Sequence, residues 1–437
     1  MSVSTAPAEK TIEQLAIDTI RTLSMDAVQA ANSGHPGTPM ALAPVAFQVW
    51  TEAMRYDPAQ PLWPNRDRFV LSCGHASMLL YSVLHLAGVK ATDKHGKVLD
   101  RPAIKLDDIK NFRQLNSPCA GHPEHGYAAG IETTTGPLGQ GVGNSVGMAI
   151  AAKWLGATYN RPGFELFNYD TYALCGDGDL MEGVSNEAAS MAGHMQLSNL
   201  CWIYDDNRIT IEGHTDLTFS EEVAKRFRGL GWNTVRVEDA NDTAAIGRAL
   251  SEFKACHDKP TLIIVRSIIG YGSPNKADTH GAHGAPLGED EIKLTKKFYG
   301  WPENEKFLVP REVPEYFRNT VGDKGAQASG EWTDKFAKYK TSFAKEAAEL
   351  EAIIARRLPA GWDSGLTEFP ADAKGMATRV SSGKVLNMLA PHMRWLLGGS
   401  ADLAPSTMTL LDKQAAFGPQ DYAGRNFHFG IREHGMA

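Results

Sequence analysis

Two short apolar runs near the middle of the chain, residues 172–174 and 200–204, predict buried strands. Between them, small and apolar residues recur at helical spacing, and Ser185 is a suitable N-cap for a helix there. The segment therefore predicts a strand, a helix and a second strand. Such a unit has a right-handed crossover, and its two strands run parallel.

Polar residues follow both of these strands. Asp177 lies in a Gly-Asp-Gly sequence directly after the first strand, and Asn207 follows the second. Because the carboxyl ends of parallel strands meet at one edge of a sheet, we expect both residues at a ligand site there. Carboxylate, amide and carbonyl oxygens suit magnesium, and Gly176 and Gly178 allow the backbone to approach a diphosphate. A strand-end turn that needs glycine is the alternative interpretation.

The remaining pattern alternates helices with strands, which indicates the α/β class. A capping box at Thr11 and Gln14 begins a helix with one apolar face. The other expected elements are strands at 68–72, 232–238 and 261–268 and helices at 145–155 and 243–256. A chain of 437 residues is long enough for two or three domains.

A change of composition after residue 302 predicts a domain boundary. Charged and proline-punctuated sequence follows, in which residues 332–357 predict a solvated helix joining two domains. We expect a first domain at 1–315, a linker at 316–373 and a second domain at 374–437, with a helix at 378–389 and a strand at 394–398. Since about sixty residues cannot easily close an α/β layer, we expect an incomplete second domain and a truncated chain.

Composition narrows the class of protein. The 44 basic and 51 acidic residues give a net charge of −7 without a basic stripe, which argues against nucleic acid as a partner. The five cysteines never have Cys-x-x-Cys spacing, so a disulfide framework or thiolate metal site is not indicated, and a reducing cytoplasm is the simplest location. The N-terminus lacks the apolar core of a secretory signal, and no apolar stretch is long enough to span a membrane.

Three histidines lie where helices or strands give way to glycine-containing turns. His35 is in Ser-Gly-His-Pro-Gly, His75 in Gly-His-Ala and His122 in Gly-His-Pro. Each alone is typical of a solvated turn, but three are harder to dismiss, because histidine transfers protons near neutral pH. His280 and His283 have a spacing that could bind zinc on a helix, yet the surrounding glycines and proline exclude a helix.

Eight motifs, taken in order, make the chain similar to the transketolases. They are Ser33-Gly34-His35-Pro36-Gly37, Gly74-His75-Ala76, Gly121-His122-Pro123, Gly136-Pro137-Leu138-Gly139-Gln140-Gly141, the unit from Asp177 to Ile209, His283-Gly284-Ala285-Pro286-Leu287-Gly288, Gly399-Ser400-Ala401-Asp402-Leu403 and Arg432-Glu433-His434-Gly435-Met436. Other thiamine enzymes are expected to share the metal unit but not the histidines. The resemblance covers essentially the whole chain. It implies a parallel-sheet thiamine-diphosphate-binding fold with helices on both faces, plus an incomplete second α/β domain that binds the cofactor's pyrimidine.

The resemblance also implies the residues of an active site. Magnesium, with calcium or another divalent ion as a substitute, would be bound by Asp177, Asn207 and the backbone carbonyl of Ile209. Thiamine diphosphate would contact His75, Gly136, Pro137, Leu138, Gly178, Asn207, His283 and Glu433. The sugar would contact His35, His122 and His283, and its phosphate would contact Arg379 and Ser406. The catalytic residues would be His35, His283 and Glu433.

Glu433 would be the essential acid. In the family this carboxyl contacts the aminopyrimidine ring of the cofactor and favours its imino tautomer, and burial beside the ring would raise its pKa, as that role needs. A surface ion pair with Arg432 is the alternative that the sequence leaves open.

The implied activity is reversible transfer of a two-carbon ketol unit from a ketose phosphate, such as xylulose 5-phosphate, to an aldose phosphate, such as ribose 5-phosphate or erythrose 4-phosphate. This reaction belongs to the pentose phosphate pathway, and the Calvin cycle is a further setting. The site would form between the subunits of a cytoplasmic homodimer. The alternatives are a ketol transferase with formaldehyde as acceptor, and a cofactor-binding or dimerising fragment without catalysis.

Overall fold

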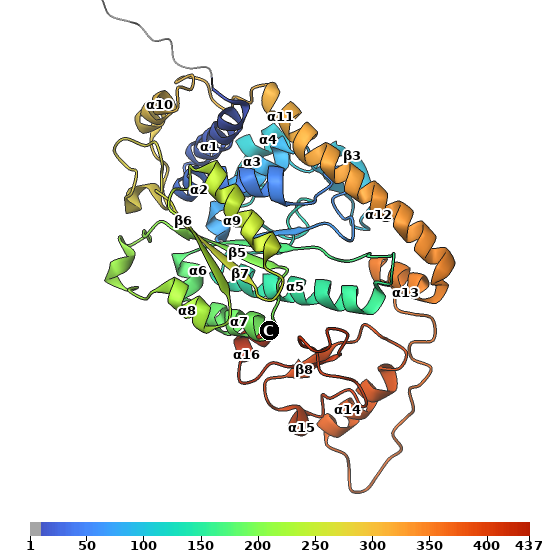
Figure 1. The fold of residues 1–437 in the computed structure, drawn as a ribbon. Helices are drawn as coiled ribbons and strands as arrows, with labels where there is room; N and C mark the ends of the chain where they lie inside the picture. Colours follow the sequence, from blue (N-terminus) through green and yellow to red (C-terminus); the bar gives the residue numbers. More distant parts are fainter. Residues whose placement is uncertain (1–9) are drawn as a thin grey trace, which may run out of the picture.

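The computed structural model describes residues 10–437. The N-terminal segment, in which the sequence predicts no secretory signal, lies almost wholly outside the described residues. At the centre is a parallel sheet with strand order β1-β4-β5-β7-β6 (Figure 1). Its strands are β1 (Arg68–Leu71), β4 (Thr171–Gly176), β5 (Leu200–Asp206), β6 (Asn233–Val237) and β7 (Thr261–Arg266). The predicted strand–helix–strand unit is therefore confirmed, with β4 and β5 as direct neighbours.

Helices cover both faces of this sheet. One layer contains α1 (Ile12–Ala31), α2 (Gly37–Gln48), α3 (Ser77–Leu86) and α9 (Thr243–Ala255), and the other contains α5 (Gln140–Tyr159), α7 (Gly183–His194) and α8 (Val223–Gly229). Alternate residues of a strand point to opposite faces, so Tyr172 and Leu174 of β4 pack in the first layer and Ala173 and Cys175 in the second. The expected α/β fold is confirmed.

Smaller elements complete the first part of the chain. They are α4 (Leu106–Lys110), α6 (Asp177–Met181), α10 (Glu289–Phe298), α11 (Glu312–Phe317) and an antiparallel hairpin of β2 (Lys90–Thr92) and β3 (Val98–Pro102). Among the residues described, none of the helices has both the length and the apolar character required to cross a membrane.

Two expected helix starts are wrong. The helix expected at 145–155 begins earlier, at Gln140, because Gly139 in a left-handed conformation (φ 80°) allows the chain to turn into it. Ser185 is not an N-cap but lies inside α7, which begins at Gly183. Its hydroxyl donates to the backbone carbonyl of Asp179 instead, so it joins α7 to the turn before it.

The charged segment after the sheet also differs from the expectation. The single helix expected at 332–357 is two helices, α12 (Asp323–Ser342) and α13 (Ala344–Ile354), because the backbone of Phe343 is not helical (φ −136°, ψ 58°). One face of α12 is buried rather than solvated. Trp332 and Tyr339 donate hydrogen bonds of 2.7 and 2.9 Å to the carbonyls of Leu166 and Tyr159, which fixes the helix to the first part of the chain.

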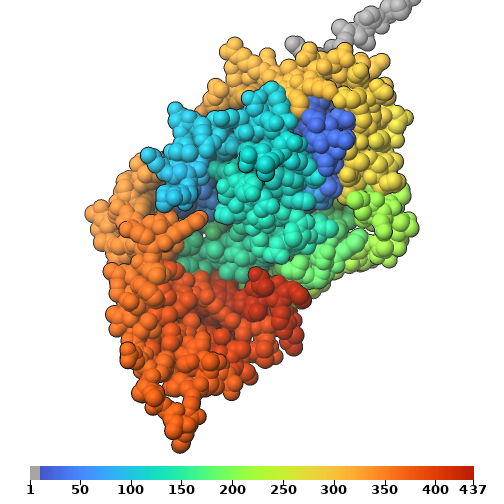
Figure 2. Space-filling model, turned by 180° about the vertical axis from the view of Figure 1, so that it is seen from behind, coloured from blue at the N-terminus to red at the C-terminus, as the bar shows by residue number. Residues whose placement is uncertain are grey.

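The C-terminal residues form a lobe at one end of the molecule (Figure 2). It contains α14 (Thr378–Leu389), β8 (Gly398–Ser400), α15 (Ala404–Thr407), β9 (Asn426–His428) and α16 (Glu433–Met436), with β8 parallel to β9. The strand expected at 394–398 is wrong, because the strand begins only at Gly398. Trp395 and Leu397 instead pack against the hydrophobic core beneath α5, which explains their apolar character.

Candidate active site

Asp177 and Asn207 leave the sheet at the same edge, as the sequence predicts. Gly176 at the end of β4 pairs with Asp205 near the end of β5, so both residues follow neighbouring strand ends. Both are almost fully buried, with 5% and 4% of their surfaces exposed. Tyr204 donates to one carboxylate oxygen of Asp177, whereas the other, Oδ2, is buried without a hydrogen-bond partner among the described residues. A buried carboxylate oxygen without a donor fits a metal ligand.

Hydrogen bonds at both ends of its amide fix the side chain of Asn207. Its Nδ2 donates to Asp205 at 2.7 Å, and Asp205 also accepts from the hydroxyl of Ser267, which follows β7. Only the amide nitrogen can donate to a carboxylate, so this contact fixes which amide atom faces Asp205. The amide oxygen accepts the backbone N–H of Ile209 at 2.8 Å. The turn that holds these atoms passes through Arg208 in a left-handed conformation (φ 63°).

Three of the four predicted histidines form one cluster. The ring centroids of His35 and His75 lie 5.0 Å apart, those of His75 and His283 5.2 Å, and those of His35 and His283 5.7 Å. His35 comes from the turn between α1 and α2, His75 from the turn after β1, and His283 from the loop before α10. The Nδ1 atoms of His35 and His283 are buried without hydrogen-bond partners among the described residues, as fits side chains that pair with a bound group.

Burial keeps these imidazoles uncharged. Burial, with smaller contributions from His283 and Arg113, lowers the pKa of His35 to about 4. The pKa of His75 lies well below its ordinary value for the same main reason, burial. Burial also raises the pKa of Asp177 to about 7, and the neighbouring Asp205 and Asp206 contribute to that rise. A divalent cation there would favour the ionised carboxylate.

Glycines bring the loops around this cluster into close contact. A Cβ on Gly74 would lie 2.9 Å from the backbone nitrogen of Gly136, and one on Gly136 would lie 3.2 Å from the ring of His122. A Cβ on Gly178 would lie 2.7 Å from the side chain of Leu138. The predicted cofactor residues Gly136, Pro137 and Leu138 therefore lie beside both a histidine and the Gly-Asp-Gly turn.

The remaining predicted residues lie elsewhere. Glu433 begins α16, which packs on α7 on the other side of the sheet from α1 and α2 (Figure 1). It is exposed in the single chain, and Arg432 donates to Ser190 and to the carbonyl of Phe429 rather than to Glu433. Arg379 and Ser406 are exposed on α14 and α15, two contacting helices of the C-terminal lobe. One chain does not bring these three residues to the histidines.

Several residues that support the site were not predicted. Asp205 lies two residues before Asn207, and Asp179 lies two residues after Asp177. In the sequence, each is only a further acidic residue in its motif. Arg113 donates to Ser33 at 2.9 Å in the turn that carries His35. Among the described residues, no group of three His, Cys, Asp or Glu side chains is arranged to hold a metal.

Comparison with known families agrees with this geometry. Residues 12–359 match the transketolase thiamine diphosphate binding domain, and residues 374–437 match the transketolase pyrimidine binding domain. The chain is 52% identical to a transketolase of Geobacillus stearothermophilus over 425 residues, and 49% identical to one of Bacillus subtilis over 428 residues. These alignments cover 97% and 98% of this chain but 62% of each relative, so the chain spans less than two thirds of their length.

Solved structures show the same relationship. A crystal structure of a Pichia stipitis transketolase in complex with sedoheptulose 7-phosphate superimposes with a TM-score of 0.92 at 45% identity, covering 98% of this chain and 62% of that one. A transketolase from Leishmania mexicana superimposes with a TM-score of 0.91 at 41% identity, covering 98% of this chain and 61% of that one. The chain therefore belongs to the transketolase family.

Proposed function

We propose that this protein is a magnesium- and thiamine-diphosphate-dependent transketolase that transfers a two-carbon ketol unit from a ketose phosphate to an aldose phosphate. The observation that supports this most strongly is the convergence of His35, His75 and His283, from distant parts of the chain, on one cluster. Similar transketolase structures from Pichia stipitis are complexes with sedoheptulose 7-phosphate and fructose 6-phosphate, which are consistent with this substrate class. The same activity suggests a place in the pentose phosphate pathway and a cytoplasmic location.

The metal and the cofactor diphosphate would be held at the carboxyl ends of β4 and β5. Asp177 and Asn207, together with the backbone carbonyl of Ile209, supply the oxygen ligands that magnesium prefers. Gly178 and the loop of Gly136 to Leu138, which lie against each other, would contact the cofactor. Thiamine diphosphate, when bound, supplies the carbon nucleophile and the electron sink of the reaction.

The histidines would bind and orient the sugar. Because burial keeps His35 and His75 neutral, each ring can donate one hydrogen bond and accept another. His35 and His283, whose Nδ1 atoms have no hydrogen-bond partner among the described residues, would hold a hydroxyl or carbonyl oxygen of a substrate and move a proton at it. His122 lies against Gly136, at the edge of the same cluster.

The site would be completed by a second copy of the chain. Glu433, Arg379 and Ser406 belong to the C-terminal lobe and lie apart from the histidines of their own chain. We propose a homodimer in which this lobe, residues 374–437, faces the site built by residues 1–315 of the other copy, with residues 316–373 as the linker. In that arrangement Glu433 would contact the cofactor, and Arg379 and Ser406 the substrate phosphate, for which a guanidinium and a hydroxyl are suitable.

A transfer assay tests this proposal. The purified chain, with magnesium and thiamine diphosphate, is given xylulose 5-phosphate and ribose 5-phosphate, and the seven-carbon ketose phosphate is measured. We expect Glu433→Gln to abolish product formation, while Glu368→Gln, a change at an exposed residue of the linker, leaves the rate within about twofold. Formaldehyde in place of ribose 5-phosphate tests the other acceptor class. Cofactor binding without turnover on any acceptor would contradict transferase activity of this chain.

A further inference from the structure

Asp179 is a buried carboxylate to which the proposed function assigns no role. It lies two residues after Asp177, and none of its surface is exposed. Its hydrogen-bond partners are the hydroxyl of Ser72 and the backbone N–H groups of Gly139 and Gly176, all of them uncharged donors. Burying a carboxylate without a cation is costly, so full pairing with donors at such a position indicates a specific role.

The three donors come from three separate turns. Oδ1 accepts from Ser72 at 2.7 Å and from Gly139 at 2.8 Å, and Oδ2 accepts from Gly176 at 2.9 Å. Ser72 follows β1, Gly139 precedes α5, and Gly176 ends β4. One carboxylate therefore joins the ends of two neighbouring strands to the start of a helix on one face of the sheet.

Ser72, whose hydroxyl donates to Asp179, replaces the cap that α5 cannot provide for itself. The N-cap residue of α5 is Gly139, which has no side chain to accept a hydrogen bond from the first turn. Asp179 accepts the N–H of Gly139, and the hydroxyl of Ser72 accepts the N–H of Val142 at 3.0 Å. A negative charge near the start of a helix is electrostatically favourable, which offsets part of the cost of burying it.

The turns that Asp179 joins are those that face the cofactor. Gly139 directly follows Gly136 to Leu138, and Gly176 directly precedes Asp177 and Gly178. Leu138 packs against Gly178 so closely that a Cβ on this glycine would lie 2.7 Å from it. A shift of either turn would therefore change the space between the metal ligand and the cofactor loop.

We propose that Asp179 is a positioning residue that holds the Gly136–Leu138 loop and the Asp177–Gly178 turn at the separation that cofactor binding requires. This inference rests on the proposed function, because it assigns these two turns to thiamine diphosphate. An asparagine in its place keeps the size but exchanges an acceptor oxygen for an NH₂ group. One of the three buried donors would then face another donor, and the turn that carries it would move.

The test compares Asp179→Asn with Asp57→Asn. Asp57 is a matched control: it is 3% exposed, and it likewise accepts from a backbone N–H, that of Ala59, and from a serine hydroxyl, that of Ser329. Asp57 joins the turn at Ala59 to α12, whereas Asp179 joins the Gly136–Leu138 loop to the Asp177–Gly178 turn. Thiamine diphosphate affinity is measured by calorimetry at saturating magnesium, together with the melting temperature of each cofactor-free protein.

We expect both substitutions to lower the melting temperature, but only Asp179→Asn to weaken thiamine diphosphate binding, by about tenfold or more. Equal affinity in Asp179→Asn and the unchanged protein would overturn the inference, as would equal losses in the two variants. If Asp179→Asn does not fold, Ser72→Ala removes one donor and should weaken binding in the same direction by a smaller factor. Failure of the unchanged protein to bind the cofactor would instead contradict the proposed function.

Discussion

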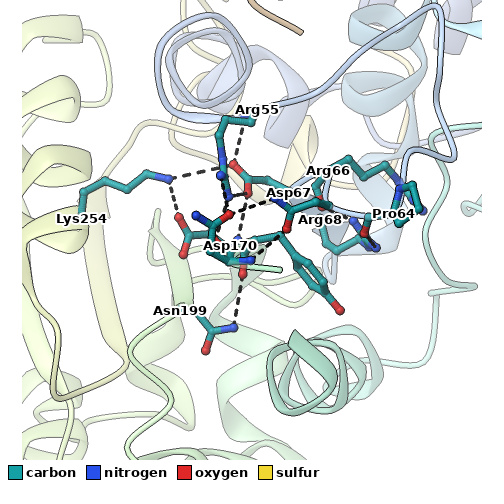
Figure 3. Close-up of polar contacts among 11 residues, drawn as sticks. Arg55, Pro64, Arg66, Asp67, Arg68, Asp170, Asn199 and Lys254 are labelled. Atoms are coloured by element: carbon teal, nitrogen blue, oxygen red, sulfur yellow. Dashed lines mark hydrogen bonds and ion pairs between the residues drawn. The ribbon is translucent and has the colours of Figure 1, made fainter. Parts of the chain in front are cut away.

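Buried aspartates lie at both ends of the central sheet, but their partners differ. At the amino ends of β1 and β4, Asp67 is completely buried and accepts from Arg55 at 2.9 Å and from the backbone of Asp170 at 2.9 Å (Figure 3). Asp170 in turn pairs with Lys254 of α9. Nearby, Glu132 accepts from Arg66. Each of these carboxylates has a basic side chain as its partner.

The carboxyl ends of β4 and β5 are arranged in the opposite way. Asp177, Asp179 and Asp205 receive hydrogen bonds from Tyr204, serines, an amide and backbone N–H groups rather than from basic side chains. One oxygen of Asp177 has no partner among the described residues. The buried aspartates at the amino end are therefore closed into ion pairs. At the carboxyl end only Asp206 pairs with basic side chains, those of Arg208 and Arg236, whereas Asp177 keeps an oxygen without a partner among the described residues. The difference predicts that aspartates at the amino end serve stability and those at the carboxyl end serve binding.

Asp67→Ala is the strongest test of the prediction that aspartates at the amino end of the sheet serve stability. Removing the carboxylate leaves the buried N–H groups of Arg55 and Asp170 without an acceptor. We expect a loss of about 3 kcal/mol in the free energy of unfolding, measured by urea denaturation, with unchanged affinity for thiamine diphosphate. Asp107→Ala, which breaks an exposed pair with Lys110, should change it by about 0.5 kcal/mol or less. Weakened cofactor binding in Asp67→Ala would remove the distinction between the two ends.

If aspartates at the carboxyl end of the sheet serve binding, Asp177→Ala should weaken cofactor binding without a large loss of stability. Loss of the only carboxylate proposed as a metal ligand should weaken magnesium-dependent binding of thiamine diphosphate about 100-fold or more, which corresponds to about 2.8 kcal/mol. The stability of the cofactor-free variant should change little, because removal of a buried carboxylate with an unpaired oxygen is offset by the loss of the acceptor of the Tyr204 hydroxyl. Calorimetric titration with and without magnesium and a thermal melt give the two values. A large drop in melting temperature with intact binding would contradict the assignment.

The central unit could be predicted because its signals are local. Apolar runs form β4 and β5, and Asp177 and Asn207 follow them directly in the sequence. The strand of the C-terminal lobe was misplaced for a physical reason. Gly399 pairs so closely with its neighbour that a Cβ would lie 1.8 Å from the carbonyl of Phe427, so glycine is required where an apolar pattern is absent.

The histidine cluster shows a different limit. The turns around His35, His75 and His283 mark these residues as unusual, but their ring separations depend on how loops far apart in the chain meet. Asp179 and Asp205 were missed because their role lies in partners from other strands, Ser72 and Ser267. Contacts between residues so far apart in the chain leave no periodic pattern in the sequence. Without these contacts, Asp179 and Asp205 resemble ordinary surface aspartates.

Asp205→Ala should have an intermediate effect, because Asp205 acts through Asn207. Without its acceptor the amide of Asn207 can turn, and the magnesium concentration for half-maximal cofactor binding should rise about tenfold. Saturating magnesium should restore most of the binding. Ser267→Ala removes the other partner of Asp205 but leaves its contact with Asn207, so it should have a much smaller effect. Equal magnesium requirements in the two variants would show that the contact with Asn207 does not position a ligand.

The smallest expected effect concerns the buried, uncharged histidines at the carboxyl end of the sheet. They allow the comparison of the two ends to be tested with a basic residue type as well as with aspartates. His75 has a pKa well below 6.5 because of burial, so between these two values the unfolded chain binds a proton that the folded chain does not. Its contribution to stability is therefore lost as pH falls below about 6.5. We expect the free energy of unfolding of the cofactor-free protein to decrease less steeply from about pH 7 to about pH 5 in His75→Gln than in the unchanged protein. The exposed His257 provides the control, since His257→Gln should leave the slope unchanged. An equally steep slope in His75→Gln would mean that this imidazole binds its proton equally well in the folded and unfolded chain, so that burial at the carboxyl end of the sheet does not keep it neutral.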